Sequence, residues 1–233
     1  MYPKWQYNEM NHVGVDYTDK YEVEAYDLRM SKLRNISKET DEIIDLVGLK
    51  RDHVLLEFGT GTGDFAIQVA DHCMKVYAVD ISQTMLKFAK QKVQNKGLNN
   101  IECCHGGFLT YQHKGVPLDV VVSQLALHHL PDFWKMVALK RIYSMLKKGG
   151  IFYLRDTVYS FDVNNYEDIF NTWLSGIKQT AGEELAKDSE IAIRDEFSTC
   201  DWIMEGLIKR AGFEIKITDY HQEVLAVYVC IKR

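Results

Sequence analysis

The chain has 233 residues, of which 46% are hydrophobic and 26% charged, values typical of a globular protein with one core. Its formal net charge of −5 argues against a nucleic-acid partner, because such binding normally uses a concentrated basic face. No apolar run approaches the ~20 residues of a membrane span, and residues 1–8 lack the apolar region of a signal peptide, so we expect a cytoplasmic protein. The five cysteines include no C-x-x-C pair, and we expect neither disulfides nor a metal site.

Residues 1–50 are unusually rich in aromatic side chains for a leader segment. A helix is expected between Ser37, a typical N-cap residue, and Gly48, a typical helix end. A second, upstream helix carries Tyr17 and Tyr26. These tyrosines either pack on the core or belong to a helical flap that closes on a pocket, and the sequence favours neither.

The most informative stretch is E-F-G-T-G-T-G at 57–63, which joins an apolar strand to an amphipathic helix. Glycine permits positive φ and the close approach of a ligand, and the helix offers unpaired N–H groups at its start. A dinucleotide fingerprint counted from Gly59 would need its third glycine where this chain has Asp64. Glu57 and Asp64 also disfavour a pyrophosphate. The stretch therefore favours a cationic ligand over the nicotinamide cofactor of an oxidoreductase.

A second short strand, 75–80, ends in Asp80. This acid lies about twenty residues beyond the glycine turn, the offset at which a carboxylate accepts hydrogen bonds from ribose hydroxyls. Ser82 is expected to cap the following helix. Met85, in the first turn of that helix, either lies over a flat heteroaromatic ring or fills the core.

Further strands are predicted over 100–104, 118–123 and 151–156, with a long helix over 131–148. Strands that alternate with helices predict a doubly wound, Rossmann-like α/β fold with a mostly parallel sheet and helices on both faces. Ligands of such sheets bind outside the carboxyl ends of the strands. We therefore expect the residues that follow each strand to line one crevice.

The segment 160–198 interrupts the alternation and reads as helical, with Trp173 on its apolar face. We expect it to form an inserted cap over the crevice. Thr199 is expected to cap one more helix, and the strands 214–219 and 224–231 are expected to pair antiparallel.

Five motifs together resemble those of class I S-adenosylmethionine-dependent methyltransferases: E-F-G-T-G-T-G at 57–63, V-Y-A-V-D-I-S at 76–82, A-L-H-H-L-P-D at 126–132, L-K-K-G-G at 146–150 and A-G-F at 211–213. The set is similar to that of small-molecule methyltransferases, a group that includes the ubiquinone and menaquinone biosynthesis enzymes. The resemblance implies one domain over 1–233, a seven-stranded sheet whose last strand is antiparallel, and a flap and cap that belong to this domain.

The resemblance also implies S-adenosylmethionine as the cofactor, with Asp80 on the ribose hydroxyls and Met85 beside the adenine. The residues expected at the cofactor are Glu57, Gly59, Thr60, Gly61, Gly63, Asp80, Ile81, Met85, Gly107, Phe108, Gln124 and Leu125. One position departs from the family pattern. Where the family usually has an acid that receives the adenine amino group, this chain has Gly107, so a water, another side chain or the Phe108 N–H with local packing must take that role.

Methyl transfer by in-line displacement depends mainly on positioning and desolvation, so no catalytic dyad is required. If the acceptor needs a base, His129 and His128 are the candidates, although the sequence favours a structural role for each. Residues expected near a small-molecule acceptor are Tyr17, Tyr26, Arg155, Asp156 and Trp173. Alternatives are a cofactor-binding module without transferase activity and an RNA methyltransferase, and the chain is expected to be a monomer or a homodimer.

Overall fold

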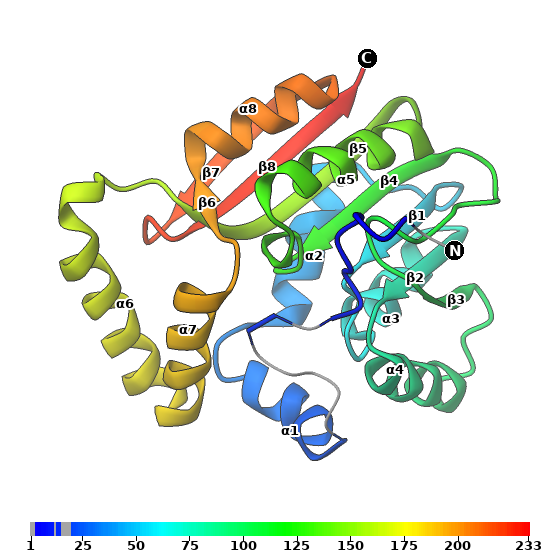
Figure 1. The fold of residues 1–233 in the computed structure, drawn as a ribbon. Helices are drawn as coiled ribbons and strands as arrows, with labels where there is room; N and C mark the ends of the chain where they lie inside the picture. Colours follow the sequence, from blue (N-terminus) through cyan, green and yellow to red (C-terminus); the bar gives the residue numbers. More distant parts are fainter. Residues whose placement is uncertain (1–2, 12, 15–19) are drawn as a thin grey trace.

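The computed structural model describes residues 3–11, 13–14 and 20–233, and it is organised around one mixed sheet (Figure 1). The strands follow the order β3-β2-β1-β4-β5-β8-β7 across this sheet, and β6 pairs with the end of β5. Their bounds are β1 Val54–Phe58, β2 Lys75–Asp80, β3 Ile101–His105, β4 Leu118–Gln124, β5 Leu146–Tyr159, β6 Thr199–Cys200, β7 Phe213–His221 and β8 Leu225–Lys232. The first five strands run parallel, and β8 is antiparallel to both β5 and β7. The predicted α/β fold is confirmed.

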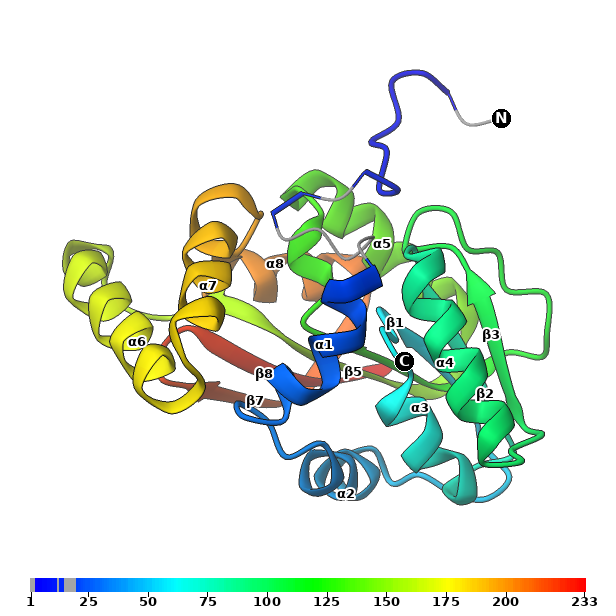
Figure 2. The same ribbon diagram turned by 90° about the horizontal axis from the view of Figure 1, so that it is seen from below.

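Helices cover both faces of the sheet (Figure 2). Their bounds are α1 Lys20–Met30, α2 Ile36–Val47, α3 Asp64–Val69, α4 Gln83–Asn95, α5 Asp132–Met145, α6 Tyr166–Ala181, α7 Glu183–Asp195 and α8 Asp201–Ala211. The continuous apolar run of β1 is buried on both sides: Phe58 packs with α5 and α8, whereas Leu55 packs with α2 and α3. Cys103 and Cys104 of β3 likewise pack against opposite layers. None of the described helices is at once long and apolar enough to cross a membrane.

Three predicted element ends are wrong. The N-cap of α2 is Asn35 and not Ser37, because the Asn35 side chain accepts the Lys38 N–H at 3.1 Å. Helix α5 stops at Met145, since Leu146 pairs with Leu118 and is buried in the core as the first residue of β5. Thr199 belongs to β6 and Cys200 is the N-cap of α8, so this helix begins one residue later than expected. The caps at Gly48 and Ser82 are confirmed.

The segment 160–198 forms the helices α6 and α7, here called the α6–α7 pair. These helices lie side by side at one end of the molecule (Figure 1). A small apolar cluster of Ile177, Ala181, Leu185 and Ala186 holds the two helices together. Met30, from the end of α1, packs against this cluster. Helix α1 therefore lies between the α6–α7 pair and α4 (Figure 2), whereas α2 belongs to the core beneath the sheet.

Candidate functional site

The turn after β1 is tied directly to the end of β2. Gly59 and Gly61 adopt φ values of 73° and 55°, in the left-handed region that favours glycine. The Gly61 N–H donates to Asp80 Oδ2 at 2.7 Å, and the Ser82 N–H donates to Asp80 Oδ1 at 2.7 Å. Two backbone donors thus fix the Asp80 carboxylate at the carboxyl end of the sheet.

A narrow cavity of about 120 Å³, here called the first cavity, opens at this end of the sheet. It is lined by Glu9, Asn11, Val13, Tyr26, Phe58, Gly59, Gly61, Asp80, Ile81, Met85, Gly106, Gly107, Phe108, Leu125, Ala126, His129 and Leu130. Eight residues that the sequence assigned to the cofactor are among them: Gly59, Gly61, Asp80, Ile81, Met85, Gly107, Phe108 and Leu125. The sequence interpretation and the geometry therefore point to the same crevice.

The other four residues assigned to the cofactor lie behind the cavity wall. Glu57 is buried and accepts the Thr60 hydroxyl at 2.6 Å. Gly63 starts α3, where a Cβ would lie 3.0 Å from the Ala89 Cβ on α4, so its glycine serves helix packing. Gln124 accepts a hydrogen bond from Arg34 Nη2 at 2.7 Å. Their positions are those of supports for the turn and the sheet edge.

The two acids beside the glycine turn carry less negative charge than their residue types indicate. Burial raises the pKa of Glu57 to about 8, because the Thr60 hydrogen bond offsets only part of the desolvation. Asp64 is paired with Lys92 Nζ at 2.6 Å, and the same ammonium lies 2.5 Å from Asp27. In the folded chain Glu57 is largely protonated at neutral pH. The negative charge beside the glycine turn is therefore smaller than the sequence predicts.

Three residues of the first cavity, Glu9, Asn11 and Val13, come from the N-terminal segment 3–14. Figure 1 shows this blue segment passing in front of the strands. Sequence reasoning assigned none of these three to a site, because each meets the cavity through contacts with residues far along the chain. Of the tyrosines expected near the acceptor, Tyr26 lines the cavity, and Tyr17 lies outside the described residues.

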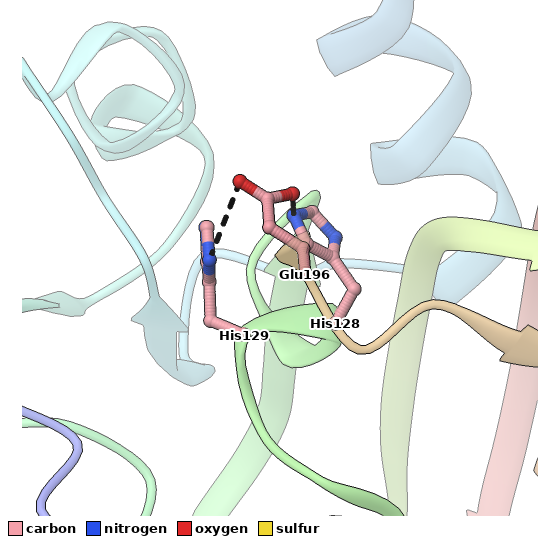
Figure 3. A group of neighbouring side chains, drawn as sticks. All are labelled: His128, His129 and Glu196. Atoms are coloured by element: carbon pink, nitrogen blue, oxygen red, sulfur yellow. Dashed lines mark ion pairs between the residues drawn. The ribbon is translucent and has the colours of Figure 1, made fainter. Parts of the chain in front are cut away.

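His128 lies between the carboxylates of Asp156 and Glu196. Figure 3 shows its contact with Glu196. Its Nδ1 contacts Asp156 Oδ1, and its Nε2 lies 3.2 Å from Glu196 Oε2. Burial by itself lowers the pKa of His128, but the two carboxylates outweigh it and raise this pKa to about 10. His128 is therefore an imidazolium at neutral pH and has no free lone pair with which to act as a base.

His129, in contrast, lines the first cavity and is only partly buried. Its Nδ1 lies 3.8 Å from Glu196 Oε1, so one glutamate contacts both histidines (Figure 3). His128, His129 and Glu196 offer ligand atoms within 4.8 Å of one another. A metal there would have to displace the proton that Asp156 and Glu196 hold on His128, so the geometry favours an ion-pair cluster.

A second cavity of about 860 Å³ lies between α1, the α6–α7 pair and the strands β5 and β8. Its apolar lining includes Met30, Leu33, Leu125, Ile169, Trp173, Ile177, Leu185, Ala192 and Leu225. Its cationic side chains are Arg29, Lys32, Arg34, His128 and Arg155, and its acidic ones are Asp168, Asp188, Glu196 and Glu223. Trp173 and Arg155, both expected near the acceptor, line this second cavity. Asp156 does not: it is fully buried and contacts His128, while its neighbours Arg155 and Thr157 face the cavity.

Two of the three arginines of the second cavity are anchored by an acid on α2, and the third, Arg29, pairs with Glu184. Glu39 accepts from Arg34 Nε at 2.8 Å and lies 2.7 Å from Arg155 Nη1. Burial opposes ionisation of Glu39, but the two guanidinium groups outweigh it and lower the pKa of this carboxyl. Sequence reasoning missed Arg34 and Glu39, although Arg34 follows the predicted flap helix within four residues.

Leu125 stands at the boundary of the two cavities and lines both, as does Tyr26. Leu125 has φ 52°, a rare conformation for a branched residue, and its N–H donates to the Arg155 carbonyl at 2.7 Å. Backbone strain of this kind clusters at functional sites, where the surrounding structure holds it. The strained turn after β4 therefore lies at the boundary between the two cavities.

The methyltransferase-domain family matches this chain over residues 55–150, from β1 to the first part of β5. An uncharacterized methyltransferase of Geobacillus sp. (strain WCH70) is 29% identical over 205 residues, which are 87% of this chain and 89% of that protein. Over these ranges the sequence of this chain is similar to that of methyltransferases.

The fold of this chain is similar to that of solved methyltransferase structures. A SAM-dependent methyltransferase from Aquifex aeolicus superposes with a TM-score of 0.64 at 16% identity, over 92% of this chain and 99% of that one. An S-adenosylmethionine-dependent methyltransferase from Clostridium acetobutylicum ATCC 824 gives 0.68 at 13% identity, over 91% of this chain and 98% of that one. At these identities the likeness shows the fold, and the roles of individual residues depend on the geometry described above.

Proposed function

We propose that this chain is a methyltransferase that binds S-adenosylmethionine in the first cavity. It transfers the methyl group of this cofactor to a small molecule held in the second cavity. The observation that carries the proposal is the shared boundary: Tyr26 and Leu125 line both cavities, so a donor in one and an acceptor in the other would meet there.

The residues of the first cavity fit a nucleoside cofactor. Asp80 presents a fixed carboxylate to the cavity, suited to two ribose hydroxyls. A Cβ on Gly59 would overlap Ala126, so this glycine serves the packing of the turn. A Cβ on Gly61 would meet only the Tyr26 ring, 4.0 Å away, so a ligand can approach the backbone there. Ile81, Met85 and Phe108 supply apolar walls for a flat ring.

The enclosed volume of the first cavity is below the ~300–1,000 Å³ usual for small-molecule sites. Three of its lining residues belong to the segment 3–14, which contacts the rest of the chain through side chains and not through a sheet. We therefore expect this segment to shift outward when the cofactor enters and to close over it afterwards.

The second cavity is large enough for a small-molecule acceptor with an apolar body. Trp173 and Ile177 of α6 and Leu225 of β8 offer apolar surface, whereas Arg155 offers charge beside the boundary residue Leu125. When bound, S-adenosylmethionine would supply a sulfonium methyl group, which an acceptor would attack in line with S-adenosylhomocysteine as the leaving group. The chain's part is to align the two molecules and to exclude water, which lowers the entropic cost of the reaction.

A base, if the acceptor carries a proton that must leave, is proposed to be His129. This side chain faces the first cavity, whereas His128 is held protonated by Asp156 and Glu196. Glu196 would then orient His129 from behind, since its carboxylate contacts both rings.

Calorimetry with S-adenosylmethionine and S-adenosylhomocysteine tests the cofactor, and a product screen over phenols, quinols, amines and carboxylic acids tests transfer. We expect both ligands to bind. One acceptor class should give a methylated product that is heavier than the acceptor by about 14 mass units, one CH₂ group. Binding without any product would favour a cofactor-binding module, and no binding of either ligand at saturating concentration would refute the proposal.

A further inference from the structure

The carboxylate of Glu9 forms part of the wall of the first cavity, although this residue belongs to the N-terminal segment. The residue is only 6% exposed. Its Oε1 accepts from the Leu109 N–H at 2.9 Å and from Thr110 Oγ1 at 2.7 Å, and its Oε2 lies 3.0 Å from the same Leu109 nitrogen. A buried acid with three donor contacts is a built feature and not a chance approach of a surface chain.

Glu9 fills the space that a side chain at position 107 would occupy. A Cβ on Gly107 would lie 2.5 Å from Glu9 Oε2 and 2.6 Å from the Glu9 carboxyl carbon. The two positions are therefore complementary: the chain lacks a side chain at the end of β3, and a carboxylate from another segment is present there instead.

Two further contacts hold the segment on either side of Glu9. The Tyr7 hydroxyl donates to the His129 carbonyl at 3.2 Å, and the Tyr7 ring packs edge-on against Phe197 with centroids 6.2 Å apart. Gly14 has φ 82°, and a Cβ there would overlap Glu196. The position of Glu9 is thus fixed by docking both before and after it in the chain.

The bonding capacity of this carboxylate indicates what it can receive. An ionised carboxylate only accepts hydrogen bonds and has about four acceptor positions. Its donors are the Leu109 N–H, which both oxygens share, the Thr110 hydroxyl and the Thr110 backbone N–H, so about one of the four positions is left for a ligand. Oε2 is the oxygen next to Gly107, where a Cβ would lie 2.5 Å away. Ile81, Met85 and Phe108 line the same cavity. An acceptor at the edge of an apolar slot selects a flat ring that carries an N–H donor.

We propose that Glu9 is the base-reading residue of the cofactor site, accepting a hydrogen bond from the amino group of the adenine ring through Oε2. The inference rests on the proposed binding of S-adenosylmethionine in the first cavity. It gives the missing acid of position 107 a replacement from the N-terminal segment, and it makes this segment part of the cofactor site.

The ionisation of Glu9 agrees with this role. Burial raises the pKa of Glu9, and the hydrogen bonds from Thr110 and Leu109 only partly oppose it. A further N–H donor at Oε2 would favour the ionised form. The amino group of a ligand would therefore offset part of the free-energy cost of ionising this buried carboxyl.

The test compares S-adenosylhomocysteine with S-inosylhomocysteine, in which a carbonyl oxygen replaces the amino group, by calorimetry on the full chain. Wild type should bind the adenosyl ligand more tightly, because the inosyl ring places a carbonyl oxygen opposite Glu9 Oε2, and its N1–H donor lies one ring position away from the place of the amino group. Glu9→Gln should narrow the ratio of the two affinities by about tenfold or more, since its amide can donate to the carbonyl oxygen. Glu102→Gln is the matched control, because Glu102 is an exposed acid on β3, beside Lys75 and outside the cavity.

A wild-type preference that Glu9→Gln narrows and Glu102→Gln leaves unchanged supports the inference. An unchanged ratio in folded Glu9→Gln overturns it while the proposed cofactor stands, whereas wild type that binds neither ligand overturns both. If Glu9→Gln does not fold, Glu9→Ala is compared with Glu9→Ala/Gly107→Asp, which moves the carboxylate to position 107. Loss of the adenosyl preference in the single variant and its return in the double variant supports the inference, and a single variant that keeps the full preference overturns it.

Discussion

Replacing Asp80 by alanine tests the cofactor site at the residue on which most of its geometry converges. The carboxylate is 8% exposed and is fixed by the N–H groups of Gly61 and Ser82, both at 2.7 Å. Hydrogen bonds to a charged group contribute about 1.5–3 kcal/mol each. Two ribose contacts that are not fully additive should therefore contribute about 3 kcal/mol, which corresponds to an affinity loss of about 100-fold.

Calorimetric titration with S-adenosylhomocysteine measures this loss. The variant also removes the acceptor of two backbone donors, so a control must separate lost binding from a loosened fold. Asp119→Ala provides it: Asp119 accepts the Val54 N–H at 2.8 Å at the opposite end of the same sheet, far from the cavity lining. Asp119→Ala should lower stability and leave the affinity unchanged. A folded Asp80→Ala variant that binds within about threefold of wild type would refute the assigned pocket.

The two histidines should respond to substitution in different ways. His128→Gln leaves Asp156 and Glu196 buried without their cation, and we expect the free energy of unfolding to fall by about 3–5 kcal/mol in chemical denaturation. The pKa of His128 is raised to about 10 in the folded chain. The stabilisation by His128 should therefore be complete below pH ~6.5, the pKa in the unfolded chain, and be lost as the pH rises through about 10. If this stabilisation were instead lost on acidification down to pH ~6.5, the predicted direction of the pH dependence would be wrong. His129→Gln should lower kcat with a proton-bearing acceptor by about 10²-fold or more while cofactor affinity changes little, and an unchanged kcat would exclude His129 as the base.

The sequence predicts the parts of this fold that depend on local patterns. The apolar run of β1, the glycine turn and Asp80 follow from periodicity and spacing, because a buried parallel strand and a tight turn restrict residue types locally. The ends of elements were less certain for a physical reason. Asn35 and Ser37 are both good N-caps, and only the tertiary path of the chain decides which one accepts the helix N–H.

Contacts between distant segments explain what the sequence missed at the site. Glu9 meets Leu109 and Thr110 about a hundred positions later, and no spacing rule connects them. Glu196 likewise reaches His128 from the end of α7. Asp64 was read as a free charge because its partner Lys92 lies on another helix. Charge at a site is a property of the folded neighbourhood, which a single sequence does not display.

The revised charge of the glycine turn leads to a test of how the site recognises a sulfonium. Glu57 is buried behind the turn with its pKa raised to about 8, and Thr60, Asp80, Arg34 and Asp64 are the groups that act on it besides burial. A bound cation favours the ionised form, so the preference for S-adenosylmethionine over its neutral-sulfur product should rise as the pH increases through about 8.

Glu57→Gln should flatten this dependence, because the amide does not titrate. The amino group of the ligand itself titrates in both proteins, so the comparison between wild type and variant isolates the contribution of Glu57. Calorimetry with both ligands at several pH values between about 6.5 and 9 measures the ratio. Parallel pH profiles in the two proteins would show that Glu57 only supports the turn through Thr60; a rising profile in wild type alone would show that the acid before the glycines is ionised by the charge of the cofactor.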